Sequence, residues 1–231
     1  MAEEKTGVFK IEGYDIPDIA QVIVSTILSC IGFMSNSLTT LIGSMLVSPL
    51  GKYTLFRDCG KDFSRSIAKN NNIIFFVNSI IVLVTSSIIG YLMGMRYKNS
   101  GNDPVNLYTD GSEFMSRASG TFDNTTLYTQ ASIALVLGFI NSLVKCKPGD
   151  NNTEVPSMAP DVIVGFGIAT SLLPPLAACG FSYGFKRSYT NTDYSSNFDS
   201  INYMYPLKVW FVNYVCITVS SYFGRTYFKS Y

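Results

Sequence analysis

Residues 19–51 read IAQVIVSTILSCIGFMSNSLTTLIGSMLVSPLG, and no Asp, Glu, Lys or Arg interrupts the chain between Asp18 and Lys52. A side-chain charge near the middle of a bilayer is costly, so charge-free stretches mark the places where a chain can cross it. Four further windows lack charge in the same way. They lie between Lys69 and Arg96, Asp123 and Lys145, Asp161 and Lys186, and Lys208 and Arg225.

A spanning helix needs about 20 predominantly apolar residues, which the last window reaches only marginally and the other four reach in full. Helices of soluble proteins carry a charge every turn or two on their wet face, and these windows have no such face. The sequence therefore predicts an all-α integral membrane protein with the lipid bilayer as its surroundings.

The chain contains an internal repeat, visible as three matched pieces in the same order in each half. GFMSNS at 32–37 matches GFINS at 138–142, SMLVSPL at 44–50 matches TSLLPPL at 170–176, and FVN occurs at 76–78 and at 211–213. Each copy is a helix, a proline-interrupted segment and a helix, so two copies predict about six membrane segments. An odd number of crossings per copy would invert the second copy relative to the first, as in many transporters.

The repeat divides the chain into five parts. These are a polar N-terminal tail (1–18), a first membrane repeat (19–95), a polar loop (96–127), a second membrane repeat (128–224) with a polar insertion at 185–205, and a C-terminal tail (225–231).

The number of crossings is set by the two proline segments. If they only dip into the membrane, each copy crosses twice and the copies are parallel. Six crossings from a cytoplasmic N-terminus place 11 of the 17 Lys and Arg inside, which agrees with the positive-inside rule. We therefore expect six crossings with both termini cytoplasmic, although Leu38 to Leu50 is short for a span. The sequons at Asn124 and Asn151 are expected to carry no glycan.

Proline inside a membrane helix removes a backbone donor and frees a carbonyl that lipid cannot satisfy. We expect Pro49, and the tandem Pro174 and Pro175, to break the two middle segments and to meet near the centre of the molecule. Polar groups would converge there and line a substrate path, whose candidate residues are Ser48, Pro49, Asn78, Thr170, Pro174, Pro175 and Asn213. The alternative is that the prolines are packing kinks and that the two amides are hydrogen-bonded glue between helices.

Several functional classes lack their chemistry in this sequence. No Asp, Glu, Lys, Arg or His lies inside a predicted span, and the chain has no histidine, which disfavours a proton relay and catalysis. No phosphate-binding loop or metal-binding helix motif is present, so we expect no enzyme activity, no cofactor and no metal. A net charge of +1 makes a nucleic-acid partner unexpected.

Two pairs of glycines, Gly90 and Gly94, and Gly180 and Gly184, have the small-xxx-small spacing that lets helices approach closely. The spacing suits packing within one chain and equally suits packing between chains. A homo-oligomer is therefore left open.

The two proline motifs resemble those of domain-of-unknown-function family 389, a group of hydrophobic membrane proteins known mainly from bacteria and archaea. IGSMLVSPL at 42–50 is similar to the family's first motif, and GFGIATSLLPPLA at 165–177 is similar to its second. The resemblance covers residues 21–224 and implies a compact multi-span domain, without an activity. Lys52 and the long polar insertions depart from the family pattern.

The function indicated is a transporter or channel-like protein for a small solute or ion, with its path between the two repeats. The alternative is a structural or scaffolding membrane protein. The abundance of Asn, Ser, Tyr and Ile is typical of an AT-rich coding genome, such as that of a large DNA virus or a protist, so a viral or host membrane is among the candidate locations.

Overall fold

The computed structural model of the protein describes residues 16–53, 65–100, 107, 112–118, 124–145, 158–189 and 202–229. All regular structure in these residues is helical. The predictions for the N-terminal tail, the second sequon and most of the two polar loops lie outside the described residues.

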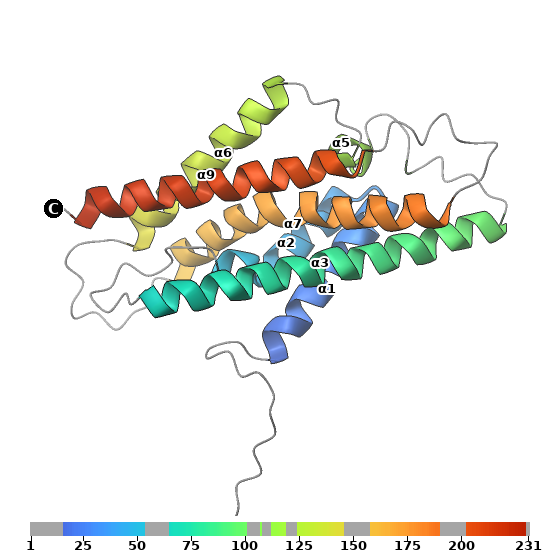
Figure 1. The fold of residues 1–231 in the computed structure, drawn as a ribbon, viewed down its shortest axis with the longest axis horizontal. Helices are drawn as coiled ribbons and strands as arrows, with labels where there is room; N and C mark the ends of the chain where they lie inside the picture. Colours follow the sequence, from blue (N-terminus) through green and yellow to red (C-terminus); the bar gives the residue numbers. More distant parts are fainter. Residues whose placement is uncertain are drawn as a thin grey trace, which may run out of the picture.

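Four helical elements form the first half of the chain (Figure 1). They are α1 (Ile16–Met34), α2 (Leu38–Val47), the 3₁₀ helix η1 (Pro49–Tyr53) and α3 (Arg65–Ser100). The second half contains a short helix and three long ones. They are α5 (Met115–Ala118), α6 (Asn124–Lys145), α7 (Met158–Ser188) and α9 (Met204–Lys229).

Helices α1 and α2 form an antiparallel hairpin. Its turn is tight, with Asn36 in the left-handed region at φ 50°, and the Ser37 side chain caps α2 by accepting from the Thr40 N–H. The Ser29 and Ser44 hydroxyls join the two helices across 2.8 Å. With 10 residues, α2 is about 15 Å long, which is half the thickness of a hydrocarbon core.

Helices α3 and α7 lie side by side and run in the same direction, whereas α9 runs in the opposite direction (Figure 1). Glycines bring the backbones of α3 and α7 together: a Cβ on Gly180 would lie 2.6 Å from the Leu83 carbonyl oxygen, and one on Gly90 would overlap the Phe181 carbonyl. Gly94 and Gly184 approach the partner helix as closely. The small-residue spacing therefore serves packing within the chain.

Helices α6 and α9 form a second close pair. A Cβ on Gly138 would lie 2.5 Å from the Ile217 carbonyl oxygen of α9. Ser142 donates to the Ser221 carbonyl at 3.2 Å, and Ser221 donates back to the Gly138 carbonyl at 3.0 Å. Two serines and a glycine thus join these helices through reciprocal hydrogen bonds.

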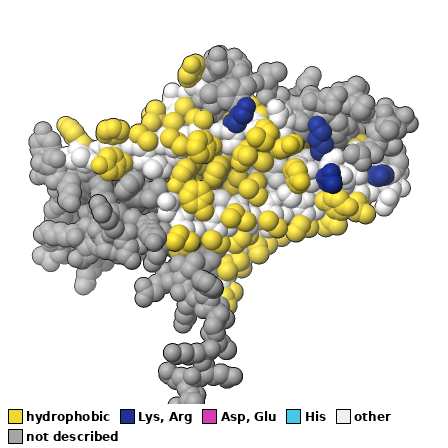
Figure 2. Space-filling model, viewed as in Figure 1, with side chains coloured by type: hydrophobic (Ala, Val, Ile, Leu, Met, Phe, Trp, Pro, Cys, Tyr) yellow, Lys and Arg dark blue, Asp and Glu magenta, His cyan; other side chains and the backbone are white. Residues whose placement is uncertain are grey.

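The outer faces of the helices are apolar. On α3 the exposed side chains recur every three or four residues, and Ile80 and Leu92 are each 59% exposed. Figure 2 shows a broad hydrophobic surface over the helices, with Lys and Arg side chains of the described residues toward its margin. A soluble monomer rarely exposes so much contiguous apolar surface, so this face is suited to lipid.

Three helical stretches among the described residues are long and apolar enough to cross a membrane: Ile16–Met34, Asn71–Ser100 and Gly165–Ser188. The apolar stretches Leu38–Val47 and Tyr128–Leu143 are shorter. The chain is thus all-helical where it is described, with three candidate membrane-spanning helices, as expected of a membrane protein.

The predicted proline break holds in one half of the chain only. Helix α2 ends at Val47, with Ser48 as its C-cap immediately before Pro49, but α7 continues through Pro174 and Pro175 as one helix of 31 residues. The prediction of a broken middle segment was therefore wrong for α7. This helix packs against α3, α6, α9 and η1. In addition, a side chain of α9 supplies a hydrogen-bond donor that a proline removes from the backbone.

A pair of matched substitutions tests the glycine contacts. Gly184→Ala places a Cβ against the Ser87 carbonyl and should lower the free energy of unfolding by about 1–3 kcal/mol through overpacking. Gly43→Ala, in α2, meets no atom within 4 Å and should raise it by up to about 1 kcal/mol through helix propensity. Unfolding of both variants in mixed detergent micelles, followed by circular dichroism, measures the difference. Equal effects at the two positions would contradict the packing.

Candidate functional site

The tandem proline of α7 leaves two carbonyls without their usual helical donors. In an α-helix the N–H of residue i bonds the carbonyl of residue i−4, so Pro174 and Pro175 remove the donors of Thr170 and Ser171. The side chain of Asn213, on α9, replaces one of them: its Nδ2 donates to the Ser171 carbonyl at 2.9 Å. A side chain of a neighbouring helix therefore satisfies the backbone that Pro175 would leave bare.

Asn213 is only 1% exposed, and the repeat matches it with Asn78, which is 0% exposed in α3. The observed bond of Asn213 is a contact between helices, which agrees with the interpretation of this amide as interhelical glue.

The proline segment of the first half lies against α7. Pro49 is buried at the start of η1, and the Ser48 hydroxyl caps this turn by accepting from the Leu50 N–H at 3.4 Å. A Cβ on Gly51 would overlap the Gly165 carbonyl of α7. The backbones of the two proline-containing segments are thus in direct contact. On α7 the contact lies at Gly165, ten residues before Pro175.

A polar cavity of about 260 Å³ lies between α5, α6, α7 and α9. Of the predicted path residues, Thr170 and Pro175 line it. Thr170 and Ser171 donate their hydroxyl hydrogens to the Gly167 carbonyl, at 2.5 and 3.2 Å, so both hydroxyls present lone pairs to their surroundings. The complete lining is Ser116, Arg117, Gln130, Thr170, Ser171, Pro175, Tyr205, Pro206 and Val209.

Arg117 was not among the residues predicted for the site. It lines the cavity because the residues just before it are held by contacts with other parts of the chain. Phe114 packs edge-to-face on Phe33 and on Phe181, with ring centroids 5.8 and 5.3 Å apart. The Glu113 N–H donates to the Asn36 side chain at 2.8 Å, which ties the segment to the α1–α2 turn. A charged residue in a predicted polar loop gives no indication in the sequence that it will line a cavity.

The Arg117 side chain is 27% exposed, and its Nη2 lies 3.5 Å from a Glu113 carboxylate oxygen. Its Nε is buried and has no hydrogen-bond partner among the described residues. Burial lowers the pKa of Arg117 from its usual value, and the neighbouring Glu113 carboxylate opposes that shift. A cation is therefore held beside the cavity with part of its donor capacity unused.

Gln130 and Tyr205 also line the cavity and were not among the predicted path residues. Gln130 did carry a signal, since it stands near the start of an apolar stretch as Gln21 does in the first half. The described residues contain no group of three His, Cys, Asp or Glu that could hold a metal ion.

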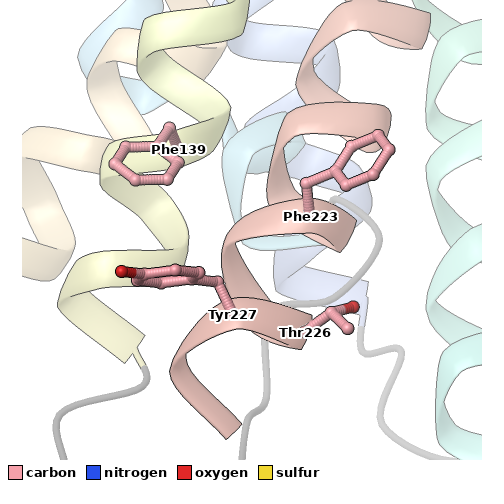
Figure 3. Close-up of a pocket in the computed structure, with 4 residues that line it drawn as sticks. All are labelled: Phe139, Phe223, Thr226 and Tyr227. Atoms are coloured by element: carbon pink, nitrogen blue, oxygen red, sulfur yellow. The ribbon is translucent and has the colours of Figure 1, made fainter. Parts of the chain in front are cut away.

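A second, apolar groove of about 620 Å³ lies at the C-terminal ends of α6 and α9 (Figure 3). Phe139 of α6 and Tyr227 of α9 border it from facing helices, while Phe223 and Thr226 lie on the other side of α9. Phe139, Phe223 and Tyr227 are all more than 40% exposed, so this groove belongs to the outer apolar surface.

Comparison of the chain with models of known protein families, with curated proteins and with solved structures found no match.

A double-mutant cycle tests the role of Asn213. Asn213→Leu leaves the Ser171 carbonyl without a donor and should lower the free energy of unfolding by about 1–3 kcal/mol. In a Pro175→Ala background the restored backbone N–H satisfies that carbonyl, so the same substitution should cost clearly less. Unfolding in detergent measures all four proteins.

Asn72→Leu is the matched control for this cycle. The Asn72 side chain accepts from the Tyr214 hydroxyl at 2.9 Å, a bond between α3 and α9 that involves no proline-freed carbonyl, so its cost should not depend on Pro175→Ala. Additive effects of Asn213→Leu and Pro175→Ala would contradict the compensation.

Proposed function

We propose that this chain is a multi-pass membrane protein that conducts or transports a small solute or ion. The observation that carries the proposal is the polar cavity beside Thr170 and Pro175, in a molecule whose outer faces are apolar. Backbone polar groups that proline frees inside a membrane helix are tolerated where they line a cavity. Pro174 removes the helical donor of the Thr170 carbonyl, and Thr170 lines the cavity.

The proposal includes six membrane segments arranged as two inverted repeats. The directions of the matched helices support it: in Figure 1, α3 and α9 run in opposite directions, and so do α2 and α7. The contact between η1 and α7 also fits an arrangement in which the proline-containing middle segments of the two repeats meet. Membership of family 389 belongs to the same proposal and is supported by the two proline motifs.

The second candidate is a structural membrane protein. The observation that favours it is the close packing of the helix pairs, in which glycines and reciprocal serine hydrogen bonds fill the contacts between α3 and α7 and between α6 and α9. A scaffold needs such contacts and no cavity. The cavity beside Thr170 is the feature that a scaffold leaves unexplained, so transport is the better-supported candidate.

Flux measurements distinguish the two candidates. Purified protein in liposomes should pass a solute or ion from a broad panel, and Thr170→Phe should abolish the flux because the ring fills the cavity. Thr226→Phe is the matched control, since Thr226 also bonds its own helix, donating to the Tyr222 carbonyl, but lies in the apolar groove of α9. No flux from well-folded protein would favour the scaffold, whereas equal flux from both variants would contradict a path through this cavity.

The predicted topology can be tested with native cysteines. Cys59 and Cys146 stand in the segments predicted to face the cytoplasm, whereas Cys30 and Cys179 are buried within helices. A membrane-impermeant maleimide should label the first two only when the cytoplasmic face is accessible, with the double variant Cys59→Ser, Cys146→Ser as the background. Labelling from the outer face would indicate that the proline segments re-enter and that the two copies are parallel.

A further inference from the structure

The polar cavity contains one cationic side chain that is only partly satisfied. A guanidinium offers five N–H donors in a fixed fork. At Arg117 the Nη2 lies 3.5 Å from Glu113, and the buried Nε has no hydrogen-bond partner among the described residues. Arg117 lines the cavity and its side chain is 27% exposed, so the accessible part of the guanidinium can still donate to a ligand there.

The opposite wall of the cavity has the complementary character. Thr170 and Ser171 use their hydroxyl hydrogens on the Gly167 carbonyl, so their oxygens can only accept further hydrogen bonds. The Gln130 side chain on α6 adds an amide that can donate or accept. The cavity therefore offers charged donors at Arg117 and neutral acceptors on α7.

Size and charge narrow the class of ligand. A cavity of 260 Å³ has room for roughly eight waters at about 30 Å³ each, which suits a small ion with a few waters and excludes a large organic solute. A cation would be repelled by Arg117. A planar or tetrahedral oxyanion matches the guanidinium fork, and its own O–H or bound water would meet the acceptors of α7.

We infer that the cavity between α5, α6, α7 and α9 binds a small oxyanion, such as a carboxylate or inorganic phosphate, through Arg117 and Gln130. The site deepens the proposed function by naming a substrate class, and it rests on that proposal only for the passage of the anion through the membrane. Glu113 competes with the ligand for the same guanidinium and tunes the affinity.

Trp210 offers an intrinsic fluorescence signal next to the cavity. It is the single tryptophan of the chain, it follows the cavity residue Val209, and its ring stacks on Phe75 at a centroid distance of 6.2 Å. Full-length protein in detergent would be titrated with potassium phosphate, sulfate and acetate at constant ionic strength in chloride. We expect a saturable change in tryptophan emission with at least one of these anions, and the anion that produces it separates phosphate-type from carboxylate-type ligands.

Two variants should act in opposite directions. Arg117→Gln should weaken binding by about tenfold or more, because a charge-assisted hydrogen bond is lost, and Arg117→Lys should restore part of it. Glu113→Gln should tighten binding, because it removes the competing carboxylate. A purely structural Arg117–Glu113 pair predicts no gain from Glu113→Gln. Arg96→Gln, which removes an exposed charge from α3, should leave the affinity unchanged.

The outcomes separate the two proposals. Saturable binding without flux would support the anion site and contradict transport. Flux without anion binding would support transport and contradict the anion site. No saturable response, or equal affinities in Arg117→Gln and the unmodified protein, overturns the site. If Arg117→Gln does not fold, the Glu113→Gln arm decides, since an unchanged or weaker affinity there is equally contrary to the inference.

Discussion

The fold depends on the need of every buried backbone polar group for a partner in surroundings where lipid offers none. The constraint is strongest in helix α7, where two successive prolines remove two backbone hydrogen-bond donors. The helix nevertheless continues to Ser188. Asn213 restores a donor to the Ser171 carbonyl, while Thr170 lies beside a polar cavity. One turn of α7 thus carries both an interhelical tie and the wall of the candidate site.

Close approach of backbones supplies the remaining cohesion. Helices surrounded by lipid gain little from burying apolar side chains against one another, so van der Waals contact between small residues becomes the main attraction. Gly90 and Gly180 provide that contact between α3 and α7, and Gly138 provides it between α6 and α9. The larger apolar side chains are correspondingly left on the outside, where Ile80 and its neighbours on α3 are exposed. Glycines inside and isoleucines outside are two consequences of the same solvent.

The sequence predicted those features that a local physical cost imposes. Charge-free windows located α1, α3 and α7 because a charge in the bilayer is costly whatever its neighbours are. The end of α2 at Pro49 was also predictable, but the continuity of α7 was not, because the donor that compensates Pro175 comes from another helix. Thr170 and Pro175 were recognised as site candidates from the proline motif. Arg117 was not, because tertiary contacts, namely the packing of Phe114 and the bond from Glu113 to Asn36, bring that loop to the cavity.

The two halves of the chain differ at residues that the repeat matches, and this difference bears on mechanism. Ser44 and Thr170 correspond, yet Ser44 is fully buried and bonded to Ser29 at 2.8 Å, whereas Thr170 lies against the cavity. Transporters with inverted repeats alternate access largely by moving one repeat against the other around a fixed site. The bond that closes Ser44 is a neutral one, worth about 0.5–1.5 kcal/mol net, which is small enough for it to open reversibly. Under the proposed function, the two halves therefore present different states of matched positions: the hydroxyl of Ser44 is closed off by Ser29, and that of Thr170 lies at a polar cavity.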